Sequence, residues 1–175
     1  ELGLVGSEMC IRDRINSLDE IDKWIEEAEE VGEVAVDTET TSLDPHQADL
    51  VGISLCSKIG KACYIPVGHK SPKCLKKDAV IKKLKKILED PSIKKIGQNI
   101  KFDFIVFYKC GITLSSMEDT MLMSYVLDAG KNRHNMDTLS EIHLGHKTIS
   151  FKEMVGTGKK EINFSEVELA VSYTH

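Results

Sequence analysis

Apolar positions in the first half of the chain predict one helix followed by three strands. Residues 18–32 carry apolar side chains at helical spacing, introduced by a capping box, Ser17 to Glu20, and closed by Gly32. The next apolar runs are short, rich in β-branched residues and separated by turn residues, which is typical of strands. The predicted strands cover residues 34–38, 50–56 and 61–67.

The second half of the chain reads mainly as helices. A stripe of apolar residues at positions 80, 81, 84, 87 and 88 predicts a helix over 78–89, which stops before Pro91. A short strand is predicted over 93–97, and further helices over 101–111, 118–130 and 136–145. The order β-β-β-α-β-α, followed by helices, indicates an α/β fold with a mixed central sheet flanked by helices.

Length and composition fit one globular domain. The 175 residues are 41% hydrophobic and 29% charged, and no apolar run approaches the ~18 residues of a membrane helix. We therefore expect no membrane association. The five cysteines form no C-x-x-C pair, so we expect reduced thiols and a cytoplasmic location instead of disulfides or a zinc site.

Charge is unevenly distributed along the chain. The net charge is −5, but residues 58–101 carry 13 basic and 3 acidic side chains. Such a basic segment could contact nucleic acid. The lysines at 82, 83, 85 and 86, however, fall largely off the apolar stripe of their helix, so a solvated helix face is the interpretation we favour.

Carboxylates gather at the end of the first predicted strand. Asp37 and Glu39 are two residues apart and so point to the same face. Two such charges ~4 Å apart repel by about 4 kcal/mol at an effective dielectric of ~20, so the pair needs a shared proton, a cation or a metal. Asp103 follows the strand 93–97 at the start of a helix, where the helix dipole favours its charge, and Asn99 can hold the intervening loop. The pattern predicts a divalent-metal site for phosphate chemistry.

The motifs D-x-E-T at 37–40 and N-x-K-x-D at 99–103 resemble the first two motifs of the DEDD 3′–5′ exonucleases. The stretches VDTETTSLDPHQADLVGISL, KIGQNIKFD, EDTMLMSYVL and RHNMDTLSEIHLGHKTISFKEMVGTGKK extend the likeness to the proofreading exonuclease domains of bacterial DNA polymerase I. The likeness runs from about residue 15 to 169 and implies a ribonuclease-H-like fold.

The resemblance also implies a mechanism and a set of site residues. Asp37, Glu39 and Asp103 would be catalytic metal ligands for two Mg²⁺ ions, with Mn²⁺ as an alternative. Hydrolysis of the terminal phosphodiester would release nucleoside 5′-monophosphates from a single-stranded 3′ end of DNA, and a polymerase domain would be the partner in the parent chain. The residues expected to bind the nucleic acid are Thr40, Leu43, Gln98, Asn99, Lys101, Arg133 and Phe151.

The resemblance is incomplete near the end of the chain. The family's third motif, Tyr-x-x-x-Asp, should follow INFSEVELA, but the 175 residues contain no such pattern. We therefore expect a truncated exonuclease domain over 15–170 with impaired activity. GSEMCIRDR and VSYTH resemble translated adapter sequence, so we interpret residues 1–14 and 171–175 as non-native ends.

Three other functions fit parts of the pattern. One is a stand-alone DEDD exonuclease acting on RNA, and another is an inactive nucleic-acid-binding module. A phosphatase of the D-x-D-x-T type fits poorly, because Glu39 stands in place of its second aspartate and the later motifs are not evident. The sequence next to this segment in the parent gene would distinguish a stand-alone exonuclease and an inactive binding module from a polymerase.

Overall fold

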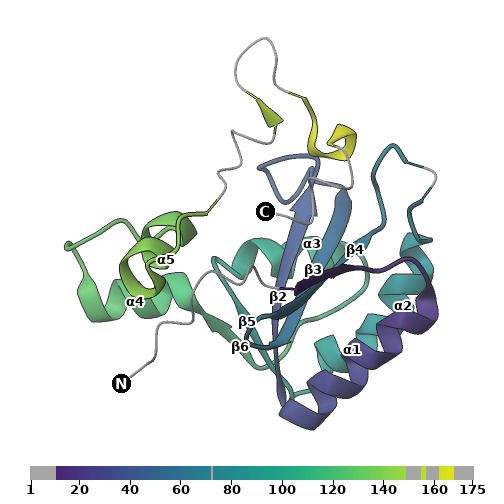
Figure 1. Cartoon of the computed structure of the whole chain (residues 1–175), viewed down its shortest axis with the longest axis horizontal. Coiled ribbons are helices and arrows are strands. Elements are labelled where there is room, and N and C mark those ends of the chain that lie inside the picture. Colours follow the sequence, from purple (N-terminus) through teal and green to yellow (C-terminus); the bar gives the residue numbers. More distant parts are fainter. Residues whose placement is uncertain (1–10, 72, 149–154, 157–161, 168–175) are drawn as a thin grey trace.

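The chain forms a twisted sheet with helices at its side and beyond one edge (Figure 1). The structure is a computed structural model, and it describes residues 11–71, 73–148, 155–156 and 162–167. The strands are β1 (Ile11–Arg14), β2 (Glu33–Thr40), β3 (Leu50–Lys58), β4 (Lys61–Pro66), β5 (Lys94–Gly97) and β6 (Met117–Asp119). The helices are α1 (Leu18–Val31), α2 (Lys77–Glu89), α3 (Lys101–Lys109), α4 (Thr120–Asp128), α5 (Met136–Leu144) and the 3₁₀ turn η2 (Phe164–Glu166).

The sheet is mixed, as predicted, and β2 lies inside it. The strand order is β1-β4-β3-β2-β5-β6. β2, β3 and β4 form an antiparallel meander, whereas β1, β5 and β6 add to it in parallel. β2 pairs with β5 over Glu33–Ala35 and with β3 from Ala35 to Thr40, so the part of β2 after Ala35 is held by β3 on one side.

One face of the sheet carries the hydrophobic core. Val34 and Val36 on β2 share this face with Ile53 on β3 and Ile65 on β4, and all four are buried. α1 and α2 lie side by side against it and bury the apolar stripes that the sequence predicts (Figure 1). Gly32 ends α1 in the left-handed conformation, with φ of 78°, as expected for a C-terminal glycine.

Two local predictions differ from the structure. The helix predicted over 118–130 begins only at Thr120, because residues 117–119 pair with β5 as strand β6 and Asp119 caps α4 by accepting from Met121 N. Ser17 does not bond to the helix backbone; its hydroxyl donates to Glu20 instead. β1 pairs with β4 at the edge of the sheet, within the segment 1–14 that we interpret as a non-native end and in which an edge strand was expected to form by chance.

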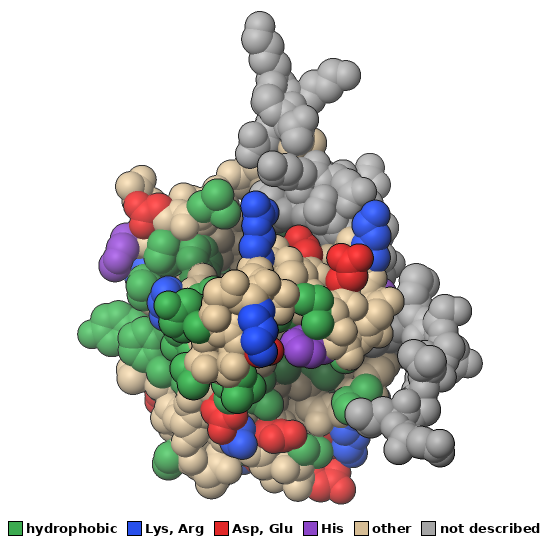
Figure 2. All heavy atoms as spheres, turned by 90° about the vertical axis from the view of Figure 1, so that its left-hand side faces the viewer, with side chains coloured by type: hydrophobic (Ala, Val, Ile, Leu, Met, Phe, Trp, Pro, Cys, Tyr) green, Lys and Arg blue, Asp and Glu red, His purple; other side chains and the backbone are tan. Residues whose placement is uncertain are grey.

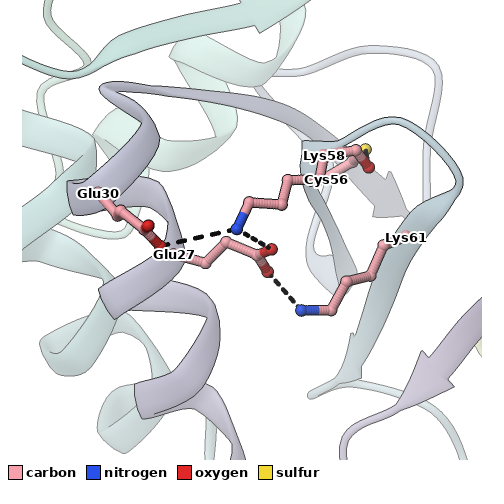
Figure 3. Close-up of polar contacts among 5 residues, drawn as sticks. All are labelled: Glu27, Glu30, Cys56, Lys58 and Lys61. Atoms are coloured by element: carbon pink, nitrogen blue, oxygen red, sulfur yellow. Dashed lines mark hydrogen bonds and ion pairs between the residues drawn. The ribbon is translucent and has the colours of Figure 1, made fainter.

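An ion-pair cluster joins α1 to the hairpin of β3 and β4 (Figure 3). Glu27 is buried, and its carboxylate lies 3.3 Å from Lys58 Nζ and 2.7 Å from Lys61 Nζ. The hydrogen bond from Lys61 is the main reason why the pKa of Glu27 lies below its ordinary value; burial opposes the shift and Lys58 adds to it. The cluster therefore favours the ionised glutamate in the folded state.

The lysines of α2 form ion pairs with neighbouring acidic groups. Lys83 pairs with Asp22 and Lys86 with Glu29, both of which belong to α1. Such ion pairs at a solvated surface fit the interpretation of the lysines at 82, 83, 85 and 86 as a solvated helix face.

Helix α4 exposes apolar side chains and contains no buried residue among its described positions. Leu122, Val126 and Leu127 are 52%, 80% and 79% exposed. Figure 2 faces this side of the molecule and shows hydrophobic side chains gathered on it. None of the helices in the described part of the chain has the length and apolar character that a membrane crossing needs.

Candidate active site

Two of the carboxylates stand on the face of β2 opposite the core. Asp37 pairs with Ser54 and Glu39 with Gly52 across the antiparallel ladder, so both project to the same side. Their direct neighbours on β3 are small, and the side chain of Tyr64 lies over Gly52. The register shifts between Glu39 and Thr40, and β2 ends there. The prediction that the two carboxylates share a face is therefore confirmed.

The third carboxylate reaches the site from helix α3. Asp103 lies in the first turn of α3 and is 3% exposed. Its Oδ1 accepts hydrogen bonds from the backbone N of Thr38 at 2.9 Å and from the Thr38 hydroxyl at 2.6 Å. Thr38 lies between Asp37 and Glu39, so these bonds fasten Asp103 to the strand that carries the other two acids. At least one carboxylate oxygen is thus used for orientation.

Burial and the neighbouring carboxylates disfavour ionisation of Glu39 and Asp103. Burial, followed by the charges of Asp37 and Asp103, raises the pKa of Glu39 to about 8. Burial and the charge of Asp37 raise the pKa of Asp103 to about 7, although both bonds from Thr38 oppose this shift. Near neutral pH the site therefore holds protons that a nearby cation would displace.

A cleft of about 720 Å³ opens over these acids. The sequence predicts that Asp37, Glu39 and Asp103 converge, and all three line this cleft. The remaining lining residues are Thr38, Thr40, Thr41, Ser42, Leu43, Gln98, Asn99, Phe102, Ile162, Asn163 and Phe164. The acids thus lie at a surface that a ligand can enter.

Carboxylate oxygens are the ligands that Mg²⁺ prefers, so the chemistry of the donor set fits a hard divalent cation. As placed, however, no three His, Cys, Asp or Glu side chains in residues 11–71, 73–148, 155–156 and 162–167 form a ready metal-binding group. Binding would therefore require adjustment of these side chains together with water or phosphate oxygens.

Four of the residues predicted to bind nucleic acid line the cleft: Thr40, Leu43, Gln98 and Asn99. Leu43 is 87% exposed, so its apolar side chain is open to a partner. Gln98 is held by its side-chain amide, which donates to His134 O at 2.6 Å.

Asn99 sits in the left-handed conformation with φ of 59°, which Asn tolerates better than most residues. Its backbone N donates to Asp119 Oδ1 at 2.9 Å. The helix-capping aspartate of α4 thereby also holds the loop that leads to Asp103.

Two of the other three predicted residues, Lys101 and Arg133, lie elsewhere. Lys101 borders a separate, mostly apolar groove between α3 and α4. Arg133 is exposed in the loop between α4 and α5. Neither of them lines the cleft, and Phe151 lies outside the described residues.

Sequence reasoning missed part of the cleft wall. Phe102 of α3 lines the cleft, although it is not among the residues that the resemblance implies; on the same helix Phe107 is fully buried and Tyr108 is 64% exposed. Asn163 donates from Nδ2 to Thr41 O at 2.9 Å and brings a distant segment to the site. No local pattern predicts a contact over 122 residues.

The chain is similar to known proteins over most of its length. A family model described as 3′–5′ exonuclease matches residues 13–173. DNA polymerase I of Rhizobium leguminosarum is 42% identical over 177 residues, covering 89% of this chain. DNA polymerase I of Pseudomonas aeruginosa is 43% identical over 154 residues, covering 85% of this chain. In both cases the match spans 17% of the relative's length.

Solved structures support the fold. The catalytic core of RRP6 from Trypanosoma brucei superposes with a TM-score of 0.69 at 16% identity, covering 94% of this chain and 42% of that one. NrnC of Brucella melitensis gives 0.63 at 24% identity, covering 93% and 70%. These likenesses confirm the predicted ribonuclease-H-like fold.

Proposed function

Since the chain belongs to the family of 3′–5′ exonuclease domains of DNA polymerase I, we propose that it hydrolyses the terminal phosphodiester at a single-stranded 3′ end of DNA. The products would be nucleoside 5′-monophosphates, and the role in the parent polymerase would be cytoplasmic proofreading. The observation that carries the proposal is the convergence of Asp37, Glu39 and Asp103 in one cleft, where burial and the neighbouring carboxylates raise the pKa values of Glu39 and Asp103.

Asp37, Glu39 and Asp103 would hold two Mg²⁺ ions, or Mn²⁺ in their place. When bound, such ions neutralise phosphate charge, acidify water and stabilise the leaving oxygen. Thr38 keeps Asp103 turned toward β2 through its two hydrogen bonds, so that this carboxylate does not have to be ordered when substrate arrives.

The cleft wall would bind the end of the strand. Leu43 and Phe102 offer apolar surface to bases, for which aromatic stacking contributes roughly 1–3 kcal/mol per base. Gln98 and Asn99 present polar groups from the loop before α3. We propose further contacts to the strand from Lys101, Arg133 and Phe151. The charged side chains of Lys101 and Arg133 would face phosphate outside the cleft.

A second candidate is a nucleic-acid-binding module with little activity. It is favoured by the 175 residues themselves, which contain no Tyr-x-x-x-Asp motif, and by the lack of a ready three-ligand group in the described part of the chain. We propose that the chain binds a 3′ end and digests it slowly. A stand-alone enzyme acting on RNA is a third candidate, suggested by the fold shared with NrnC and RRP6.

The test is release of mononucleotides from 3′-labelled single strands of DNA and RNA in Mg²⁺. Asp37→Ala serves as the control, and a longer piece of the parent polymerase with the same substitution is measured in parallel. We expect slow release by the 175 residues, faster release by the longer piece, and none after substitution. Lack of release by the longer piece would favour the inactive module, and a preference for RNA would favour the third candidate.

A further inference from the structure

A buried tyrosine and histidine lie behind the cleft. Tyr64, on β4, and His69, in the loop that follows, are 2% and 7% exposed. Tyr64 Oη and His69 Nε2 are 2.6 Å apart. Burial raises the pKa of the tyrosine and lowers that of the histidine, so the two groups share a hydrogen bond between neutral partners.

Tyr64 reaches the strand that carries the catalytic acids. Glu39 pairs with Gly52 on β3, and Tyr64 pairs with Ser54 on the same face. A Cβ atom at Gly52 would lie 1.9 Å from Tyr64 Oη, so the hydroxyl occupies the space that a larger residue would fill. The negative charge of Glu39 also acts on the tyrosine, which places the two side chains near each other. The absence of a side chain at Gly52 is therefore what lets Tyr64 stand beside Glu39.

His69 faces the opposite wall of the cleft. Its ring centroid lies 5.8 Å from that of Phe164, which lines the cleft. The next residue, Lys70, donates from its backbone N to Ser165 O at 2.8 Å and pairs through its side chain with Glu166. The loop after β4 is thus bonded to the segment 162–167 at several points.

We propose that Tyr64 and His69 are positioning residues, which set the separation between the Glu39 end of β2 and the cleft wall 162–167 so that the cleft fits one nucleic-acid strand. The inference rests on the proposed function. Neither residue touches the reacting atoms; they act through Glu39 on one side and Phe164 on the other. A shift of about 1 Å in such a wall is enough to lower reactivity strongly.

The experiment combines two readouts on the 175-residue chain. Binding of a 5′-fluorescein-labelled oligothymidylate in EDTA is followed by anisotropy. Amide hydrogen exchange is followed over 162–167, where Glu166 N and Val167 N donate within the segment. The variants are Tyr64→Phe, His69→Ala and His69→Gln, of which Gln can still hydrogen-bond to Tyr64. Tyr108→Phe and His143→Ala are matched controls at exposed positions.

We expect His69→Ala and Tyr64→Phe to raise the Kd about three- to tenfold and to speed exchange in 162–167, because one buried hydrogen bond is lost. His69→Gln should restore part of the affinity and part of the protection from exchange. The control variants should change neither the Kd nor the exchange rate. Faster exchange with an unchanged Kd, or no change in either readout, would overturn the positioning role while leaving the proposed function standing. Failure of the wild-type chain to bind in EDTA, together with failure to release mononucleotides in Mg²⁺, would overturn both.

Discussion

Replacing Glu39 by Gln should stabilise the metal-free chain, and increasingly so as pH rises. Burial and the charges of Asp37 and Asp103 raise the pKa of Glu39 from its ordinary 4.5 to about 8. A carboxyl group with a raised pKa contributes stability that is complete below pH 4.5 and is lost as pH rises through about 8. Gln has a similar shape and no charge, so the variant avoids this loss.

The size of the effect follows from the same shift. Because a tenfold change in an ionisation equilibrium corresponds to about 1.4 kcal/mol, the shift to a pKa of about 8 sets an upper limit of about 5 kcal/mol. Glu39 is only half-buried and titrates together with Asp103, so solvent and the shared proton reduce this limit. We expect the variant to gain about 1–3 kcal/mol over wild type between pH 5 and pH 9.

The assay is urea unfolding in EDTA at pH 5 and pH 9, followed by fluorescence of the single tryptophan, Trp24, which is 5% exposed. Glu33→Gln is the matched control, since Glu33 lies on the same strand but is exposed. Addition of Mg²⁺ at pH 9 should stabilise wild type more than Glu39→Gln. Equal loss of stability in both proteins between the two pH values would refute the electrostatic reasoning.

Three other substitutions test different parts of the structure. Lys95 is fully buried and donates from Nζ to the carbonyls of three residues at and beyond the end of α2, so Lys95→Met should lower the free energy of unfolding by about 2–4 kcal/mol in urea titrations. Thr38→Val should lower the free energy of unfolding by about 1–2 kcal/mol and slow mononucleotide release by a longer active piece, because Asp103 loses a hydrogen bond. Unchanged release rates would argue against a role for the orientation of Asp103. Glu27→Gln should cost about 1 kcal/mol at pH 7 and progressively less below pH 4.5, since a lowered pKa stabilises the fold only while the carboxyl is ionised; thermal unfolding across this range measures it.

The sequence alone determined most of the regular elements and the chemistry of the site. The period of two in a strand is enough to put Asp37 and Glu39 on one face, and Gly32 is enough to end α1. Both properties depend on backbone geometry over a few residues, which local patterns report well. The resemblance of the two motifs to the exonuclease family then implied that Asp103 belongs to the same site.

The tertiary structure decided the features that depend on contacts between distant residues. β6 is a strand because β5 provides the hydrogen-bonding partner, although its three residues carry no strand pattern of their own. Phe102 faces the cleft because of how α3 is fixed to β2 through Asp103 and Thr38. The wall 162–167 meets the site through the loop after β4, through Thr41 and through packing of Phe164 and Val167 with Val51 of β3. Pairings at such separations depend on how whole elements pack, and the local order of polar and apolar residues does not specify that packing.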